Sequence, residues 1–244
     1  MNQTLGNTAG VRSVDAGRGL GWWTDAWALF LKNPGMWIVL GLVMGIIFIV
    51  LAFIPILGAL ALALLAPVFT GSWMLAARKA AGGGTIEIGD LFSAFKSERM
   101  GSLIVIGALL LAVVFVLGLL MFLFGAGAAI GVGAGASAGS AGGALAAAGM
   151  GLVMLLVSFV VGIAIGMAFW FAPGLVILGG LAPVDAIKGS FAGSLKNIVP
   201  FILYAVIYVV AAIIASIPFG LGWLALLPLL MLTIFVSYRD IYGA

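Results

Sequence analysis

Few side chains in this sequence could do chemistry. The 244 residues contain no histidine and no cysteine, 10 lysines and arginines, and 7 aspartates and glutamates. Without histidine and cysteine there are no disulfides, no thiol nucleophiles, no imidazole acid–base catalysis and no metal sites built from these ligands. The carboxylates are scattered along the chain, and their spacing does not favour a catalytic pair. We therefore expect no enzymatic activity, no bound metal and no cofactor.

Three prolines inside apolar stretches are candidates for kinks in the middle of a membrane: Pro67, Pro173 and Pro228. A proline within a helix has no N–H, bends the helix and leaves the carbonyl four residues earlier without its partner. Freed carbonyls at mid-membrane can bind substrates in transporters. The alternative is a kink repaired by a nearby hydroxyl, which membrane helices tolerate. Thr70, Ser72 and Thr233 are near enough in sequence to do this.

Tyr204 and Tyr208 form the most polar face of any apolar segment, one helical turn apart. A buried phenol needs a hydrogen-bond partner, so the two tyrosines are a candidate cavity wall. The alternative places Tyr204 in an interfacial aromatic belt and Tyr208 in ordinary helix packing.

A second group of residues could contact lipid headgroups: Trp22, Trp23, Trp27, Lys32, Phe191 and Lys196. They belong to two of three short amphipathic segments, which are Leu20–Lys32, Ile88–Lys96 and Pro183–Lys196. Apolar side chains recur there at spacings of three and four, which predicts one apolar helical stripe. Such a stripe suits a helix lying in the headgroup plane. A helix packed beneath its own bundle would give the same pattern.

The elements that must position these residues are membrane spans. Hydrophobic residues make up 65% of the chain and charged residues 7%, whereas a soluble domain has about 25% charged residues. No charge lies within 33–77, 100–184 or 197–238. Because a spanning helix needs about 20 apolar residues, we predict an all-α fold with six transmembrane helices: Met36–Phe53, Leu57–Ala77, Leu103–Phe124, Leu152–Leu178, Pro200–Ile217 and Leu221–Tyr238.

The charges also predict the orientation. All lysines and arginines fall on one side of the predicted spans, so the positive-inside rule places this side and both termini in the cytoplasm. The net charge of +3 reflects this topology and contact with anionic lipid, so we expect no nucleic-acid binding. Residues 1–19 are polar, which predicts a disordered cytoplasmic N-terminus. No apolar stretch begins near Met1, and no cleavable signal peptide is expected.

Residues 20–240 are predicted to form a single transmembrane domain of three hairpins, each preceded by a cytoplasmic amphipathic helix. The internal repeat units are about 20–79, 85–180 and 183–240. The first and third match residue by residue, as Leu31-Lys32-Asn33 aligns with Leu195-Lys196-Asn197. Same-direction units of this kind are parallel repeats. A Gly/Ala-rich insert at 125–151 is either an outer loop or helix extension, and we favour partial helix because long charge-free loops are uncommon.

Two sets of residues resemble known membrane proteins. The first set resembles an uncharacterised family of six-helix bacterial inner-membrane proteins: Gly19–Asn33 with its tryptophans, Asn33-Pro34, Ala66-Pro67 up to Arg78, and Thr85–Phe95 with Asp90-Leu91-Phe92. The second is distantly similar to the membrane domain fused to some glycerophosphodiester phosphodiesterases: Phe171-Ala172-Pro173, Ala186, Ser190 and Lys196-Asn197. The resemblance covers about 17–240 and implies the architecture and a bacterial inner-membrane location, but no activity. The Gly/Ala-rich insert departs from it.

Two functions fit these patterns. The first is a non-enzymatic protein that organises membrane lipids, or binds a protein partner or a second copy, at the cytoplasmic membrane face. The tryptophans and basic residues near that face favour it. The second is a passive transporter or channel for an uncharged or lipid-like solute, suggested by the three prolines. Proton-coupled transport and voltage sensing are disfavoured, since no charge lies within a predicted span.

Overall fold

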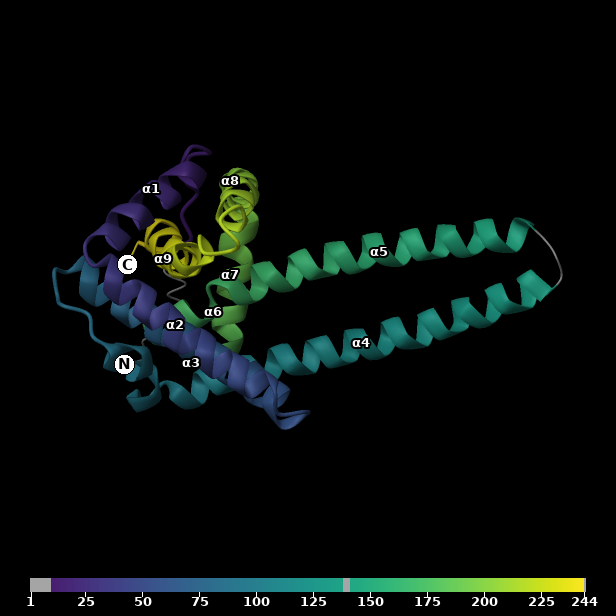
Figure 1. Cartoon of the computed structure of the whole chain (residues 1–244), viewed down its shortest axis with the longest axis horizontal. Helices are drawn as coiled ribbons and strands as arrows, with labels where there is room; N and C mark the ends of the chain where they lie inside the picture. The colour runs from purple at the N-terminus through teal and green to yellow at the C-terminus, as the bar shows by residue number, and fades with distance from the viewer. Residues whose placement is uncertain (1–9, 138–140, 244) are drawn as a thin grey trace, which may run out of the picture. The chain divides into compact units, whose positions relative to one another are not determined.

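The computed structural model describes residues 10–137 and 141–243, and every regular element among them is a helix. This confirms the all-α prediction for the described part of the chain. Figure 1 shows the elements in order: α1 (Arg18–Leu31), α2 (Pro34–Ala52), α3 (Leu57–Ala81), the 3-10 helix η1 (Ile88–Lys96), α4 (Met100–Ser137), α5 (Ala141–Trp170), α6 (Ala172–Ile177), α7 (Pro183–Lys196), α8 (Ile198–Ser216) and α9 (Trp223–Tyr242).

Six helical stretches within the described residues are long and apolar enough to cross a membrane: Pro34–Ala52, Leu57–Ala81, Met100–Gly125, Gly149–Ile177, Ile198–Ser216 and Trp223–Tyr242. They overlap the six predicted spans, so the multi-pass prediction is confirmed by length and composition. The fourth stretch is interrupted, because α5 ends at Trp170 and α6 begins at Ala172. The pairing into three hairpins and the cytoplasmic side stay predictions.

Helix continues into the Gly/Ala-rich insert from both ends. α4 extends to Ser137 and α5 begins at Ala141, so the helical alternative holds for the described residues of 125–151. Residues 138–140 lie outside the described part. A helix satisfies its own backbone donors and acceptors, which a charge-free loop beside a membrane cannot do without other partners.

The chain divides into two compact units, one of Met1–Ala108 with Met167–Ala244 and one of Leu109–Gly166. The single transmembrane domain over 20–240 stays a prediction. The second unit contains no charged residue, and its parts of α4 and α5 meet where the Ser158 hydroxyl lies 3.3 Å from the Met121 sulfur. The same hydroxyl donates to the Met154 carbonyl, which gives this polar side chain a partner within an apolar helix.

In the first unit α9 packs against α1, α2, α3 and α8 (Figure 1). Most of its side chains are buried, which makes it the central helix of this unit. α2 approaches α9 closely because Gly41 has no side chain: a Cβ there would lie 3.3 Å from the Pro228 Cδ. Trp37 of α2 stacks on Trp73 of α3 with 5.4 Å between the ring centroids. The core of this unit is therefore aromatic and centred on α9.

The turns before α3 and α9 each contain a non-glycine residue with positive φ. Ile56 directly follows Pro55 with φ of 63°, and Phe219 directly follows Pro218 with φ of 52°. At Ile56 the Leu57 N–H donates to the Pro55 carbonyl, which closes a γ-turn, whereas before α9 the Phe219 N–H donates to the Ile217 carbonyl. A proline followed by an apolar residue with positive φ thus stands at equivalent places in the first and third predicted repeat units, although the hydrogen bonds of the two turns differ.

The three predicted amphipathic segments are helical, with bounds within two residues of those predicted. The second is a 3-10 helix, begun by a capping box in which Asp90 accepts from the Glu87 N–H at 2.8 Å. In a 3-10 helix, side chains three apart lie on one line. Phe92 and Phe95 accordingly both pack on Phe69 of α3, with ring centroids 6.1 and 5.0 Å away. The aromatic stripe of η1 therefore faces its own bundle.

Candidate functional site

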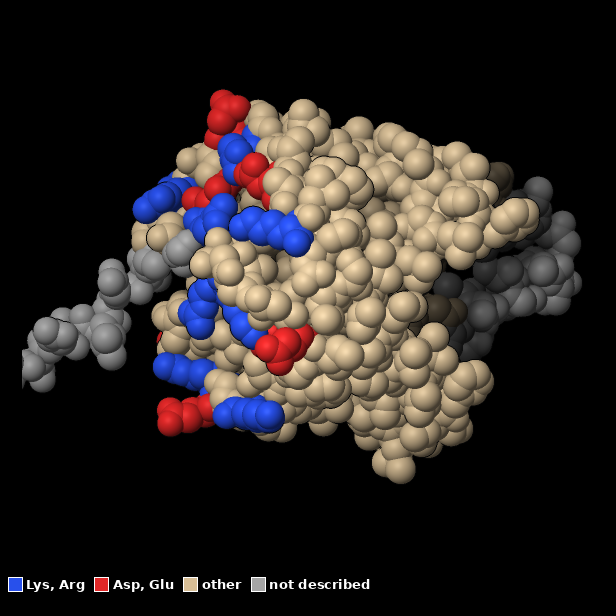
Figure 2. Space-filling model, turned by 60° about the vertical axis from the view of Figure 1, so that its left-hand side comes forward, with Lys and Arg blue, Asp and Glu red and all other residues tan. Residues whose placement is uncertain are grey.

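The charged residues of the first unit gather at one end of it, while the rest of the visible surface is uncharged (Figure 2). We call this end the charged face. The C-terminal ends of α1, α3 and α9 contribute basic residues to this face. Lys32 follows α1, Arg78 and Lys79 are in the last turn of α3, and Arg239 is in the last turn of α9. Basic side chains at helix C-termini interact favourably with the helix dipole, which explains the sign of the charge there.

Two adjoining hollows lie in the charged face, and together we call them the basic pocket. The first has a volume of about 280 Å³ and is lined by Asp25, Ala28, Leu29, Lys32, Ala81, Phe235, Val236 and Arg239. The second has a volume of about 350 Å³ and is lined by Arg78, Ala81, Gly82, Leu178, Phe235, Tyr238 and Arg239. Ala81, Phe235 and Arg239 line both hollows. Three cations thus converge on one apolar floor.

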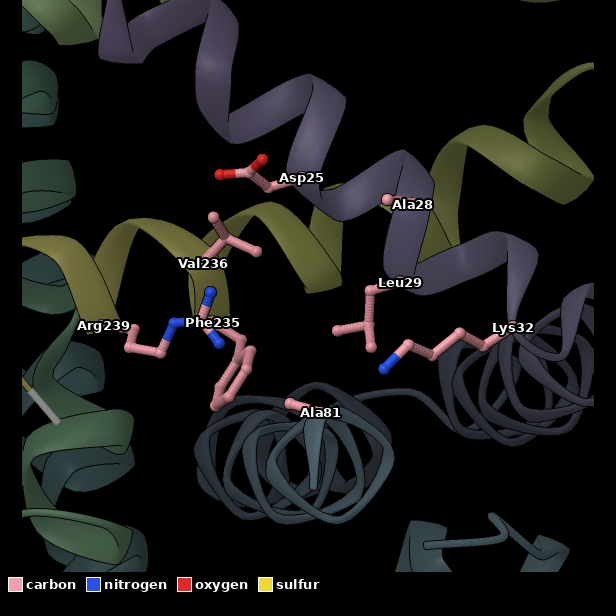
Figure 3. A pocket seen from close by; sticks show the side chains of 8 residues that line it. All are labelled: Asp25, Ala28, Leu29, Lys32, Ala81, Phe235, Val236 and Arg239. Carbon is pink, nitrogen blue, oxygen red and sulfur yellow. The ribbon is translucent and has the colours of Figure 1, made fainter. Parts of the chain in front are cut away.

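Figure 3 shows how the first hollow is built. The ammonium group of Lys32 points into it from α1, and the guanidinium group of Arg239 enters from α9 on the opposite side. The Arg239 Cζ atom lies 5.8 Å from the centroid of the Phe235 ring, a cation–π distance that keeps the guanidinium over the aromatic floor. An ammonium and a guanidinium group facing one hollow can bind an anion.

The one carboxylate in the lining, Asp25, is already paired. Arg18 donates to Asp25 at 2.8 Å and to Asp240 at 2.6 Å, and the Trp22 indole N–H donates to Asp240 at 2.9 Å. The hydrogen bond to Asp240 raises the pKa of the Arg18 guanidinium above its ordinary value, against the desolvation that lowers it. This network ties α1 to α9 and leaves Lys32, Arg78 and Arg239 as the excess charge of the basic pocket.

The predicted headgroup-contact residues divide into two groups. Trp22 and Trp23 are buried, and Trp23 stacks on Tyr204 of α8 with 5.1 Å between ring centroids. This placement favours the alternative of a helix packed beneath its own bundle. Trp27 and Phe191 are exposed by 47% and 39%. α1 therefore turns adjacent tryptophans inward and keeps Trp27 outside.

Lys196 is engaged rather than free to meet a headgroup. Its ammonium donates to the Val11 carbonyl at 2.7 Å. The neighbouring Asn197 is buried and makes three hydrogen bonds: its amide oxygen accepts from the Val14 N–H at 2.8 Å, and its amide nitrogen donates to the Arg12 and Gly193 carbonyls at 2.9 and 2.8 Å. The described part of the predicted disordered N-terminus, from residue 10, is therefore anchored. Residues 1–9 lie outside the described part.

Pro67 and Pro228 lie inside α3 and α9 as predicted, and both are buried. Pro67 leaves the Ala63 carbonyl without its helical N–H. α4 covers that carbonyl, since a Cβ on Gly107 would lie 2.5 Å from the Ala63 oxygen. The Thr70 hydroxyl donates to the Ala66 carbonyl at 3.0 Å and not to the freed Ala63 carbonyl. The cover from α4 favours a structural kink over an open binding site.

Pro173 lies within the apolar stretch Gly149–Ile177, in the first turn of α6 and directly after the break between α5 and α6. Proline suits this position, where its missing N–H has no helical partner to lose. The break before α6 is bridged from α7: the Ser190 hydroxyl donates to the Met167 carbonyl at 2.7 Å and accepts from the Phe171 N–H at 2.9 Å. The hydroxyl that bridges the break thus comes from the next helix along the chain, and the Ser194 hydroxyl of the same helix donates to the Met167 carbonyl at 3.3 Å.

Tyr204 is buried and shares a hydrogen bond with Thr233 of α9, at 3.1 Å between the hydroxyl oxygens. Tyr208 is partly buried against the same core. Neither lines the basic pocket. Their surroundings favour helix packing over a cavity wall.

Sequence reasoning named Lys32 but missed Arg78, Arg239 and Phe235. The available indication was the position of both arginines directly after the end of a predicted span. Within the described residues no cluster of carboxylates could hold a metal ion. Comparisons with models of known protein families, with curated proteins and with solved structures find no match for this chain.

Proposed function

We propose that this chain is a multi-pass protein of the bacterial inner membrane, with both termini in the cytoplasm, that binds anionic lipid at its charged face. The observation that carries the proposal is the gathering of lysines and arginines at one end of the first unit, whose remaining visible surface carries no charge (Figure 2). Anionic lipid headgroups attract such residues by about 1 kcal/mol each. The acidic residues are few and scattered along the chain, and histidine and cysteine are absent. Both features support a non-enzymatic role.

Two exposed aromatic side chains support a lipid ligand over a soluble one. Trp27 of α1 and Phe191 of α7 are both exposed and belong to helices at the charged face. Aromatic rings are favoured at headgroup depth, where one side is apolar and the other wet. A passive channel, the second function predicted from the sequence, draws no support from the prolines, because Gly107 and Gly41 pack against the kinked regions of α3 and α9.

The architecture in this proposal is three hairpins, each led by a cytoplasmic amphipathic helix, with the first and third related by duplication. Several paired features support the duplication. The turns at Ile56 and Phe219 each place a residue with positive φ directly after a proline, and Pro67 and Pro228 lie inside corresponding helices α3 and α9.

The test of the proposed function is native mass spectrometry of the protein extracted from membranes of mixed composition. We expect phosphatidylglycerol or cardiolipin to be retained in excess of phosphatidylethanolamine. A Trp27→Ala, Phe191→Ala double variant should lower that excess. Phe115→Ala, at an exposed aromatic in the charge-free unit, is the matched control and should leave it unchanged. Equal retention of anionic and zwitterionic lipids by the unsubstituted protein would overturn the proposal.

A further inference from the structure

We infer that the basic pocket is a specific site for the phosphate group of an amphipathic phosphoester, with Lys32, Arg78 and Arg239 as its ligands. This inference rests on the proposed function and deepens it. The proposed function needs only a surface that attracts anionic lipid. The basic pocket adds one defined position where a phosphate is held.

The shape of the lining supports a defined site. Arg239 lines both hollows, Lys32 lines only the first, and Arg78 lines only the second. A phosphate bound beside Arg239 therefore has a second cation available on either side. Arginine presents a planar fork of donors that matches phosphate oxygens, and lysine adds a compact point charge. The cation–π contact with Phe235 restrains the Arg239 guanidinium before any ligand binds.

Local charge also favours an anion, once the groups already paired are set aside. Asp25 is held by Arg18, and Lys79 is held by Asp90 at 2.9 Å. Lys32 makes one longer contact, 3.3 Å to the Ala80 carbonyl at the end of α3. The dipole at a helix C-terminus accounts for the presence of basic residues there. It does not account for three of them lining two hollows that share the ring of Phe235. A cation that only compensates a helix dipole needs no hollow beside it.

The apolar part of the lining indicates what is attached to the phosphate. Leu29, Val236 and Phe235 line the first hollow, and Leu178, Tyr238 and Phe235 line the second. Small-molecule pockets are mostly apolar, with a few polar groups that fix orientation, and volumes start near 300 Å³. The two hollows are of this order. They suit a headgroup and the first carbons that follow it, and the ligand class is a glycerophosphate carried by a lipid.

The experiment measures dissociation constants of the full chain in zwitterionic nanodiscs. The lipid probe is short-chain phosphatidic acid, and the soluble probes are glycerol 3-phosphate and inorganic phosphate. The variants are Lys32→Gln, Arg78→Gln and Arg239→Gln. Lys188→Gln is the matched control, since Lys188 is an exposed cation of α7 outside the lining. Arg239→Lys keeps the charge and removes the fork.

A charge-assisted hydrogen bond contributes about 1.5–3 kcal/mol, so each pocket variant should weaken phosphatidic acid binding by about 10- to 100-fold. General attraction to a charged surface, at about 1 kcal/mol per cation, predicts about 5-fold for Lys188→Gln. Arg239→Lys should recover part of the loss. If glycerol 3-phosphate binds with the same dependence on these residues, the phosphate site stands and its source is soluble.

Two results would overturn the inference. One is the absence of saturable binding of every phosphate probe to the unsubstituted protein. The other is a loss in the pocket variants no greater than in Lys188→Gln. If anionic lipid is still retained in the second case, the proposed function survives and only the pocket is refuted. Size-exclusion profiles and helical circular dichroism that match the parent chain identify variants that fold. If Arg239→Gln does not fold, Arg239→Lys still tests the role of Arg239.

Discussion

Asn197 should control whether the N-terminal segment stays attached to the first unit. Two of its three hydrogen bonds reach that segment, at the Val14 N–H and the Arg12 carbonyl, and the side chain is 1% exposed. Asn197→Ala removes both. At a net contribution of about 1 kcal/mol for each intramolecular bond, detachment becomes easier by about 2 kcal/mol, or about 30-fold in the opening equilibrium.

Limited digestion with trypsin measures this opening directly, because Arg12 lies within the anchored segment. Cleavage follows the population of the open form when closing is faster than cutting. We therefore expect cleavage after Arg12 to accelerate by about 30-fold in Asn197→Ala. The Arg12 N–H bond to the Ile241 carbonyl and the Lys196 bond to Val11 remain in the variant, so detachment stays partial.

The aligned residue of the first repeat unit supplies the control. Asn33 makes one side-chain bond, a cap on the Met36 N–H at 3.3 Å, and Asn33→Ala should cost about 1 kcal/mol of helix stability with no change at Arg12. Asn197→Asp keeps the acceptor for Val14 and loses the donor to Arg12, so its cleavage rate should fall between those of Asn197 and Asn197→Ala. A cleavage rate in Asn197→Ala within about threefold of the parent chain would refute the reasoning.

Three further substitutions test the packing of the first unit, each followed by reversible unfolding in detergent. Ser190→Ala should lower the free energy of unfolding by about 2 kcal/mol, because it removes both hydrogen bonds that bridge the helix break. Ser194→Ala removes one longer bond and should lower it by under about 1 kcal/mol. Equal losses in the two variants would contradict this. Gly107→Ala should cost about 1–3 kcal/mol, since its Cβ would overlap the backbone of α3, and Gly118→Ala, with open space around it, should be neutral or stabilising. Tyr204→Phe removes one hydrogen bond between spans and should cost about 0.6 kcal/mol; a loss of several kcal/mol would indicate a role beyond packing.

The membrane spans were predictable because bilayer thickness sets the length of a spanning helix, and charges are costly inside it. The same apolar content does not report a break; Pro173 predicted a kink in this span, but a bend within one helix and not the interruption at Phe171. The bridge across that break comes from Ser190, on a separate helix whose packing no local pattern encodes. Ser190 is one of the residues on which the resemblance to other membrane domains rests, and its role here is structural.

The direction of side chains around α1 was less predictable than the helix itself. Trp22 and Trp23 are adjacent in sequence and both are buried, because α8 and α9 lie on neighbouring sides of α1. A single apolar stripe predicts only one such side. The basic pocket could not be predicted from the sequence either, because it depends on the packing of several helices. Its cations come from three helices far apart in the chain, and each alone looks like ordinary charge at the end of a span.

The two aligned Lys-Asn pairs indicate where function and structure separate in this chain. Lys196 and Asn197 are both used to hold the N-terminal segment. Lys32 has one longer contact to a helix end and points its ammonium group into the basic pocket, while Asn33 only caps α2. If the units arose by duplication, the shared sequence reports the helix geometry common to both copies. The proposed phosphate site then depends on a difference between the copies. In the third unit the N-terminal segment accepts a hydrogen bond from Lys196, whereas in the first unit no such segment binds Lys32 among the described residues.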